Sequence, residues 1–228
     1  PSGAAEIRQA GYEFDRMRKR ILRHLNQRSE MLSGISHDLR TPLTRMKLQI
    51  AFIKDEELSK KLSEDINEME KMLNEYLQFT SSTFAEKDEL FNLSELMDEI
   101  ITKYNNKNIS KDIPSRIYFN GRKNLIRRCF NNLIENSIRY GNKLNIELSK
   151  KKVNLIIKVE DDGPGIPENE YENVFKPFYK IDKSRAETKS SVGLGLSIAS
   201  DIVRSHGGNI KLEPSKLGGL KVRIFLPS

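Results

Sequence analysis

The segment SHDLRTPL, residues 36–43, contains a histidine, a carboxylate and a hydroxyl. Together these groups could carry out a group-transfer reaction. An imidazole is a nucleophile, and a carboxylate bonded to its Nδ1–H would fix the tautomer and leave Nε2 to react. Because adjacent helix positions do not face each other, Asp38 could instead act on an incoming group, whereas Thr41 shares a helix face with His37. The Thr41 hydroxyl could hold a water against a group on the histidine. A helical histidine alone is more often structural, so its neighbours carry the prediction of a reactive His37.

Pro42 follows this histidine by little more than one turn, within a strongly helical pattern. Proline removes the backbone hydrogen bond that would reach the Asp38 carbonyl, and its ring crowds that carbonyl. We therefore expect a weak or bent helix at Pro42, in keeping with a role in motion.

Two asparagines, Asn132 and Asn136, are spaced i and i+4, so on a helix their amides point the same way. Amide oxygens are hard, neutral ligands that suit a magnesium ion also held by phosphate oxygens. Arg139 and Tyr140 follow and add a cation and a hydroxyl nearby. Two solvated asparagines are the plain alternative, and only the other segments favour a site.

A carboxylate ends an apolar strand in the segment DDGPGIP, residues 161–167. Asp161 could accept a hydrogen bond from an adenine amino group, and Gly163 and Gly165 would let the backbone approach the ring closely. An ordinary turn is the alternative, because a DxGxG pattern alone is a weak signal.

Glycines open a predicted helix in the segment GLGL, residues 193–196. Glycines at a helix N-terminus present backbone N–H groups and the positive end of the helix dipole to phosphate. The pattern is not a P-loop, because no Gly-Lys-Ser/Thr follows.

An aromatic segment, FKPFYK (residues 175–180), precedes a polar, charged stretch that runs to residue 192. This pattern predicts a mobile lid held at its ends by aromatic side chains. Lys180, Lys183 and Arg185 could reach a terminal phosphate, although a solvated charge run is the alternative for each. The four segments together predict a nucleotide site.

The reactive histidine lies in a predicted helical hairpin. Apolar residues recur three and four positions apart from Met17 to Leu39 and from Leu58 to Leu77, on either side of a polar break at residues 54–56. This spacing is typical of two helices with an a/d seam. Two helices cannot enclose a core, so we expect a second copy to complete a four-helix bundle, with packing onto the rest of the chain as the alternative.

Beyond residue 91, helical and strand patterns alternate. Helices are predicted over residues 93–104, 123–140 and 194–206, and Asn92 or Ser94 could cap the first. Strands are predicted over residues 116–119, 144–148, 153–159, 209–212 and 220–226. Such an order predicts an α+β sandwich, a mostly antiparallel sheet with helices on one face.

Composition narrows the class of protein. The 228 residues are 37% hydrophobic and 31% charged, without a run of 18 apolar residues or a signal-peptide pattern, which predicts a soluble chain. Cys129 is the single cysteine, which excludes an internal disulfide framework, and its apolar neighbours predict a core position. The net charge of +7 comes from 39 positive and 32 negative residues, a mixed surface that does not predict nucleic-acid binding.

The order of these segments resembles the cytoplasmic core of a bacterial two-component sensor histidine kinase. The SHDLRTPLTR segment is similar to the H-box and is closest to that of the EnvZ osmosensor subgroup. The other boxes follow in family order over residues 33–226: NNLIENSIRYG is similar to the N-box, EDDGPGIP to the G1 box, VFKPFYKID to the F-box and VGLGLSIA to the G2 box.

The resemblance implies a domain order. Residues 1–16 would be the C-terminal part of a HAMP-like signalling helix, and residues 17–82 a HisKA-type dimerisation and phosphotransfer hairpin. A linker (83–91) would lead to a Bergerat-type, ATP-binding α/β sandwich (92–228). It also implies a homodimer, and the cytoplasmic portion of an inner-membrane sensor whose sensor and membrane spans lie upstream.

The resemblance further implies a role for each motif residue. His37 would accept the γ-phosphoryl of ATP and pass it to an aspartate of a response-regulator receiver domain docked nearby. Asp38 would be the acid/base partner, and Thr41 would support dephosphorylation of the regulator. Asn136 would bind Mg²⁺ with help from Asn132. ATP would be bound by both asparagines, by Asp161 at the adenine, and by Arg139, Tyr140, Gly163, Gly165, Ile166, Phe178, Tyr179, Lys180, Arg185, Gly193, Leu194, Gly195 and Leu196.

The chain departs from the family pattern at two places. Asp162 stands where the family usually has asparagine, and Ser191-Val192 replaces the usual Gly-Thr before GLGL. These changes bear on lid geometry and nucleotide affinity rather than on the reaction class. Two alternatives stay open: a gyrase- or Hsp90-type ATPase, which uses a glutamate where Asn132 stands, and a dimeric scaffold with a degenerate nucleotide site. The sequence does not identify the stimulus or the response regulator. It also does not indicate whether transfer occurs in cis or in trans, or how kinase and phosphatase activities are balanced.

Overall fold

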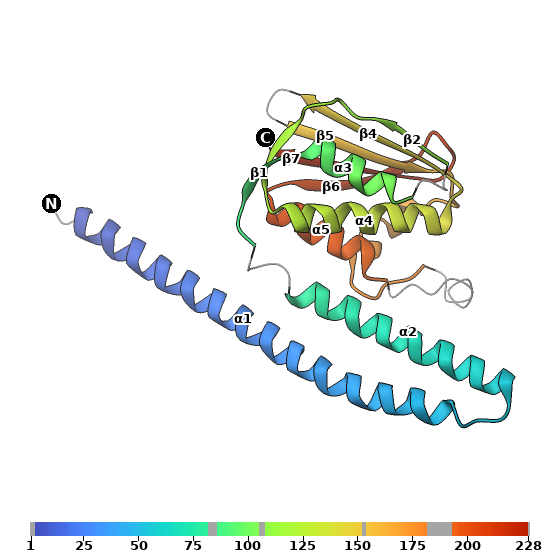
Figure 1. Cartoon of the computed structure of the whole chain (residues 1–228). Coiled ribbons are helices and arrows are strands. Elements are labelled where there is room, and N and C mark those ends of the chain that lie inside the picture. The colour runs from blue at the N-terminus through green and yellow to red at the C-terminus, as the bar shows by residue number, and fades with distance from the viewer. Residues whose placement is uncertain (1–2, 82–85, 105–107, 152–153, 182–192, 228) are drawn as a thin grey trace. The chain divides into compact units, whose positions relative to one another are not determined.

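The structure is a computed structural model that describes residues 3–81, 86–104, 108–151, 154–181 and 193–227 (Figure 1). In several helical residues, His37 among them, the side chain lies outside this description. The chain divides into two compact units, Pro1–Phe84 and Ala85–Ser228, and each is described by itself.

The first unit is the expected helical hairpin of α1 (Gly3–Ile50) and α2 (Glu56–Ser81). Asp55 caps the start of α2, because its Oδ1 accepts the N–H of Glu57 at 3.0 Å and of Leu58 at 3.1 Å. A carboxylate in this place satisfies backbone donors that have no partner within the helix. The polar break expected at residues 54–56 is thus the connection between the helices.

The hairpin is closed by packing near its turn. Leu43, Ile50 and Ile66 are buried together. Lys47 Nζ contacts Glu70 Oε2 at 2.8 Å across the two helices. Pro42 lies inside α1, and the helix continues beyond it to Ile50. The helix, which we expected to be weak or bent at Pro42, is therefore not broken there.

Much of α1 before this packed region carries exposed apolar side chains. Ile7 is 75% exposed, and Met17, Ile21, Ile35 and Leu39 are exposed as well. Burying such residues is the main source of helix stability in water. The hairpin therefore presents an apolar stripe that nothing within its own described residues covers.

The second unit is an α+β sandwich. A five-stranded sheet has the order β2-β4-β5-β7-β6, in which β2 is parallel to β4 and the other pairs are antiparallel; β1 and β3 form a separate antiparallel pair. Figure 1 shows α3, α4 and α5 on one face of the large sheet. The elements are β1 (Glu89–Asn92), α3 (Leu93–Thr102), β2 (Asn108–Asp112), β3 (Tyr118–Gly121), α4 (Lys123–Tyr140), β4 (Lys143–Lys151), β5 (Asn154–Asp161), η1 (Glu168–Glu170), η2 (Asn173–Phe175), α5 (Gly195–Ser205), β6 (Asn209–Pro214) and β7 (Leu220–Pro227).

The core lies between the sheet and these helices. Along β4, β5 and β7 buried residues alternate with half-buried ones, as in a sheet with one covered face. Cys129 is buried on α4, and burial raises the pKa of its thiol to about 12, so the predicted core position is confirmed. The expected helix over 123–140 matches α4, and Asn92 caps α3 through Oδ1.

Several expected boundaries are corrected by the structure. Residues 89–91, assigned to the linker, belong to β1, because Phe91 packs edge-on against Phe119 of β3 with ring centroids 6.0 Å apart. The strand expected at 116–119 is β3, which runs from Tyr118 to Gly121. The sequence also gave no sign of β2, which is held by its parallel pairing to β4.

Candidate active site

Asn132 and Asn136 of α4 are half-buried, and Asn132 faces the start of α5. The Asn132 amide Nδ2 donates to the Arg128 carbonyl at 3.0 Å. A Cβ placed on Gly195 would lie 3.6 Å from Asn132 Oδ1. The structure therefore brings together Asn132 and the GLGL segment, which are 63 positions apart.

α5 begins at Gly195, after the buried Leu194, and no side-chain hydrogen bond caps it. Backbone N–H groups at the start of a helix lack intrahelical partners and attract anions. The start of α5 thus supplies backbone N–H donors close to Asn132.

Asp161 ends β5 and is only 4% exposed. Its Oδ1 accepts two backbone hydrogen bonds, from Gly163 N–H and from Leu220 N–H, both at 3.0 Å. Gly219 packs so closely that a Cβ there would overlap the Asp161 carboxylate. Within the described part of the chain no hydrogen bond is made to Asp161 Oδ2, so one oxygen is held and the other is left for a donor.

The loop after Asp161 packs on the C-terminal end of α4. A Cβ on Gly163 would lie 3.0 Å from the Tyr140 carbonyl oxygen, so only glycine fits without a shift. Gly165 has φ +69°, a conformation that favours glycine. The expected close approach of the backbone at these two glycines is thus seen as contact with the protein itself.

Asp162, the departure from the family pattern, links the same two elements. Its Oδ1 accepts the N–H of Asn142 at 2.6 Å and of Lys143 at 2.8 Å. The backbone N–H groups of Lys143 and Asn142 hold the pKa of the Asp162 carboxyl below its usual value. The carboxylate therefore stays ionised and fastens the segment after α4.

The aromatic segment adjoins GLGL through the backbone. Phe178 N–H donates to the Gly193 carbonyl at 3.0 Å, and both residues have positive φ, 65° and +78°. A positive φ is uncommon for a bulky residue and indicates a constrained backbone. A Cβ on Gly193 would lie 2.9 Å from the Tyr179 carbonyl oxygen. The aromatic segment and the first glycine of GLGL thus lie in contact. Lys183, Arg185, Ser191 and Val192 lie outside the described residues.

Tyr179 is hydrogen-bonded to η1, which precedes the aromatic segment. Its hydroxyl donates to Glu170 Oε2 at 2.6 Å, and this bond raises the pKa of the Tyr179 hydroxyl. The same bond, with a second from Asn173, lowers the pKa of Glu170. The Tyr179 hydroxyl therefore fixes the aromatic segment to η1, a contact that the sequence did not suggest.

The reactive-histidine segment lies in the first unit. His37 falls within α1, with its side chain outside the described residues, and Asp38 and Thr41 are exposed. The i, i+4 spacing of His37 and Thr41 along one helix is as expected.

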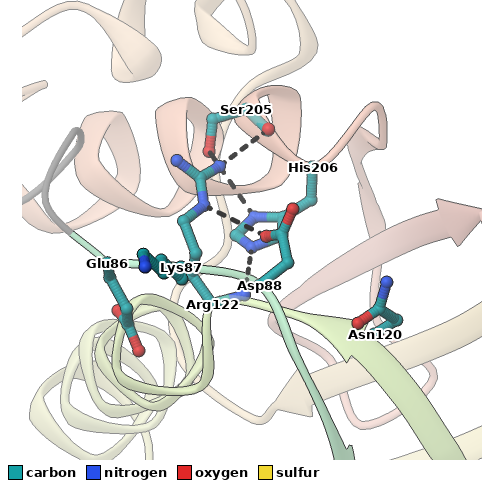
Figure 2. Close-up of a pocket in the computed structure, with 7 residues that line it drawn as sticks. All are labelled: Glu86, Lys87, Asp88, Asn120, Arg122, Ser205 and His206. Carbon is teal, nitrogen blue, oxygen red and sulfur yellow. Dashed lines mark hydrogen bonds and ion pairs between the residues drawn. The ribbon is translucent and has the colours of Figure 1, made fainter.

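A separate pocket lies in the second unit where α4 begins and α5 ends, at the opposite end of both helices from Tyr140 and Gly195 (Figure 2). Its lining residues come from three distant parts of the chain: Glu86, Lys87, Asp88, Asn120, Arg122, Ser205 and His206.

Polar contacts organise this pocket. The Arg122 guanidinium donates to the carbonyl and the hydroxyl of Ser205, both at 2.7 Å, and approaches Asp88 at 3.8 Å. His206 Nε2 accepts Arg122 N–H at 3.1 Å, and Nδ1 lies 2.7 Å from the Ile202 carbonyl. Since a carbonyl can only accept and an N–H can only donate, the ring proton lies on Nδ1. His206 directly follows the last residue of α5 as its C-cap residue.

Glu86 caps α4 from outside the helix. Its Oε1 accepts Asn124 N–H at 2.7 Å and its Oε2 accepts Leu125 N–H at 3.2 Å. Arg122, which precedes the helix, makes no side-chain cap. The linker expected over residues 83–91 thus contributes contacts to the second unit.

Comparison with known families assigns the two units. The His Kinase A (phospho-acceptor) domain matches residues 27–83, and the histidine kinase-, DNA gyrase B- and HSP90-like ATPase family matches residues 121–228.

Curated relatives match along nearly the whole chain. Sensor histidine kinase GtrS of Pseudomonas aeruginosa is 34% identical over 99% of this chain and 47% of its own length. Sensor histidine kinase CpxA of Escherichia coli K12 is 29% identical over 99% of this chain and 52% of its own length. The chain thus spans about half the length of these relatives. Among solved structures, full-length ShkA in complex with AMPPNP shares the fold, with a TM-score of 0.67 and 18% identity over 87% of this chain and 45% of that one.

The chain belongs to the bacterial two-component histidine kinases, a family of ATP-dependent protein kinases, and carries their catalytic core of a phosphoacceptor domain followed by an ATP-binding domain. The phosphoacceptor match over residues 27–83 separates it from the gyrase and Hsp90 type of ATPase. Among the described residues, no helix combines the length and the apolar composition that crossing a membrane requires.

Proposed function

We propose that this chain phosphorylates itself on His37 with ATP bound between α4, the end of β5 and the start of α5. The observation that carries the proposal is Asp161, a buried carboxylate with Oδ1 held by two backbone N–H groups and Oδ2 left for a donor. An adenine amino group is such a donor. Asn132, packed beside Gly195, supports a place for the phosphates at the other end of the nucleotide.

Magnesium fits the side chains that we assign to it. Asn136, with Asn132, offers neutral amide oxygens, and no group of three or more histidine, cysteine or acidic residues that could hold a metal occurs among the described residues. Mg²⁺ keeps several waters and binds through few protein oxygens together with substrate phosphates. Bound there, the ion would neutralise phosphate charge, while the asparagine oxygens would fix its place.

The proposed reaction is phosphoryl transfer to an imidazole. A ring nitrogen of His37 attacks the γ-phosphorus, a P–N bond forms, and the bond from phosphorus to the bridging oxygen breaks to release ADP. Asp38 accepts the ring proton or orients the ring. The positive end of α5 stabilises the charge on the phosphates.

A second step would move the phosphoryl to a partner protein. Phosphohistidine would transfer its group to an aspartate of a response-regulator receiver domain docked near His37. Thr41 would later position the water that dephosphorylates the regulator, since it lies one turn from His37 on the same helix. The exposed apolar residues of α1 support a homodimer in which two hairpins form a four-helix bundle. We further propose that the chain is the cytoplasmic portion of an inner-membrane sensor kinase.

The proposal is tested by comparing ATP labelled at the α- and γ-phosphates. The purified chain, with Mg²⁺, should gain label from γ-labelled ATP only, and Asp161→Ala should lose both this label and nucleotide binding. Addition of a receiver domain should then remove label from the kinase. ADP release without a labelled protein would instead favour an ATPase, and nucleotide binding without any turnover would favour a scaffold.

A further inference from the structure

We propose that Asp162 is a positioning residue that joins the two halves of the nucleotide site. One half is α4, which carries Asn132 and Asn136 for the metal and phosphates. The other half is the end of β5, where Asp161 faces the adenine. The inference rests on the proposed nucleotide site and adds a residue that the family motif does not supply in this form, because Asp162 stands where asparagine is usual.

The geometry places Asp162 at the junction of these halves. Its Oδ1 accepts the N–H groups of Asn142 and Lys143, the two residues between Gly141 at the end of α4 and the interior of β4. Gly141 N–H donates to the Ser137 carbonyl at 2.8 Å and closes the last turn of α4. One carboxylate oxygen thus joins the residues that follow α4 to the loop that begins with Asp161.

Packing around this junction is tight. A Cβ on Gly141 would lie 2.8 Å from Asp162 Oδ1, and a Cβ on Gly163 would lie 3.0 Å from the Tyr140 carbonyl oxygen. Asp162 N–H also donates to the Lys143 carbonyl at 3.3 Å. The loop and the helix end are therefore in contact on both sides of Asp162, so a displacement of one moves the other.

The negative charge of Asp162 strengthens its hydrogen bonds to Asn142 and Lys143. A hydrogen bond to an ionised acceptor is roughly twice as strong as a neutral one. Lys143, which supplies one of the two N–H donors, also carries the cation that acts on the carboxylate. An asparagine at this position would keep the acceptor oxygen but lose the charge, and an alanine would lose both.

This role predicts different effects on ligands that span one half or both halves. ADP with Mg²⁺ would contact both α4 and Asp161, whereas adenosine would contact only the Asp161 half. A residue that sets the spacing of the halves therefore matters for ADP and little for adenosine. A residue that merely shapes the adenine pocket would affect both ligands equally.

The experiment titrates the whole chain with Mg²⁺-ADP and with adenosine and compares Asp162→Ala, Asp162→Asn and a control, Asp98→Ala, which removes an exposed carboxylate paired with Lys111 elsewhere in the same unit. Asp162→Ala should lower ADP affinity about tenfold and leave adenosine affinity within about twofold, which is the scale of losing charged hydrogen bonds. Asp162→Asn should recover most of the ADP affinity, and Asp98→Ala should bind as the unaltered chain does. In autophosphorylation, Asp162→Ala should raise the KM for ATP about tenfold and change kcat little.

Other results would overturn the inference. Equal losses for ADP and adenosine, or no loss for either ligand, contradict a role in spacing. A failure of the unaltered chain to bind ADP would instead refute the nucleotide site itself, so the two failures are distinguishable. If thermal unfolding shows that Asp162→Ala does not fold, Asp162→Ser takes its place, because its short side chain cannot reach both amides.

Discussion

A buried carboxylate is costly unless it is hydrogen-bonded, and the fold meets this cost at Asp161 from two directions. Gly163 N–H comes from the next loop and Leu220 N–H from β7, 59 residues away. The sequence predicted the place of Asp161 because an apolar strand ends there. It could not predict Leu220 as a donor, because that contact depends on the pairing of β5 with β7.

Asn136 provides a direct test of the proposed metal site. We expect Asn136→Ala to weaken Mg²⁺-ATP binding about 10- to 100-fold, the usual scale for disturbing a metal site, because an amide oxygen is lost. ADP binding measured with a chelator should change little. Asn131→Ala is the matched control, since it removes an asparagine of the same helix that is not assigned to the site. Equal effects of the two variants in nucleotide titrations would argue against a metal ligand at Asn136.

His206 predicts a pH dependence of stability. Burial lowers the pKa of His206 below its ordinary value of 6.5, and the Arg122 cation acts in the same direction. The unfolded chain then binds a proton at a pH where the folded chain does not, so the free energy of unfolding should fall as the pH decreases below about 6.5 and level off below the folded pKa. Denaturant unfolding at several pH values measures this.

His206→Gln serves as the reference for this measurement, because glutamine can hydrogen-bond but does not titrate in this range. The variant should lack the acidic fall in stability between pH 6.5 and the folded pKa. A fall of the same size in both proteins would assign the effect to other groups.

The contacts among the residues around Arg122 could not be predicted from the sequence. Glu86, Arg122 and His206 are brought together from positions 36 and 84 residues apart, and no local motif links them. His206 precedes Gly207 and Gly208 in the sequence, a pattern typical of a helix end. Its bond to Arg122 N–H was not foreseeable, because it requires α4 and α5 to be packed side by side.

At the scale of elements, α4 carries much of the proposed chemistry and is fixed at both ends by other segments. Glu86 caps its N-terminus and Asp162 holds the residues after its C-terminus. The apolar periodicity of residues 123–140 predicted its bounds. Both fixing side chains lie outside the helix, so periodicity could not reveal them.

The cap can be tested by Glu86→Ala. The change leaves two N–H groups at the start of α4 without their acceptor, so we expect the second unit to lose about 1 kcal/mol of unfolding free energy. Amide exchange of Asn124 and Leu125 should become faster. Glu172→Ala, which removes another exposed carboxylate of the same unit, should leave both measurements unchanged. Unaltered exchange in Glu86→Ala would show that the cap does not form in solution.

Short strands were the elements least visible in the sequence. β1 has four residues and β2 has five, and their burial is irregular or slight. Such strands are held by pairing partners rather than by a pattern of their own. The longer strands β4, β5 and β7 alternate along one covered face and were therefore predicted in place.

At the scale of the whole molecule, the exposed apolar residues of α1 bear on assembly. A stripe of this kind on a long helix predicts association with a second hairpin. The order of the motifs allowed the family to be predicted, because each box is weak alone and the sequence of boxes is specific. The regulator and the stimulus depend on surfaces and segments that no motif encodes.

A double substitution tests the proposed assembly. Ile21→Lys with Leu39→Lys places charge on the exposed stripe of α1, so we expect a dimer to become a monomer in analytical ultracentrifugation. Leu217→Lys, at an exposed apolar position of the second unit, is the control and should stay dimeric. A doubly substituted chain that remains fully dimeric would place the interface elsewhere.

The most direct test of the proposed function is the chemical nature of the phosphorylated residue. The chain and His37→Ala are incubated with γ-labelled ATP and Mg²⁺, and the product is treated with acid and with alkali. We predict a label that is lost in acid, survives alkali and is absent from His37→Ala, while that variant still binds ATP. A label that persists in His37→Ala, or one stable to acid, would contradict the assignment of His37 as the phosphoacceptor.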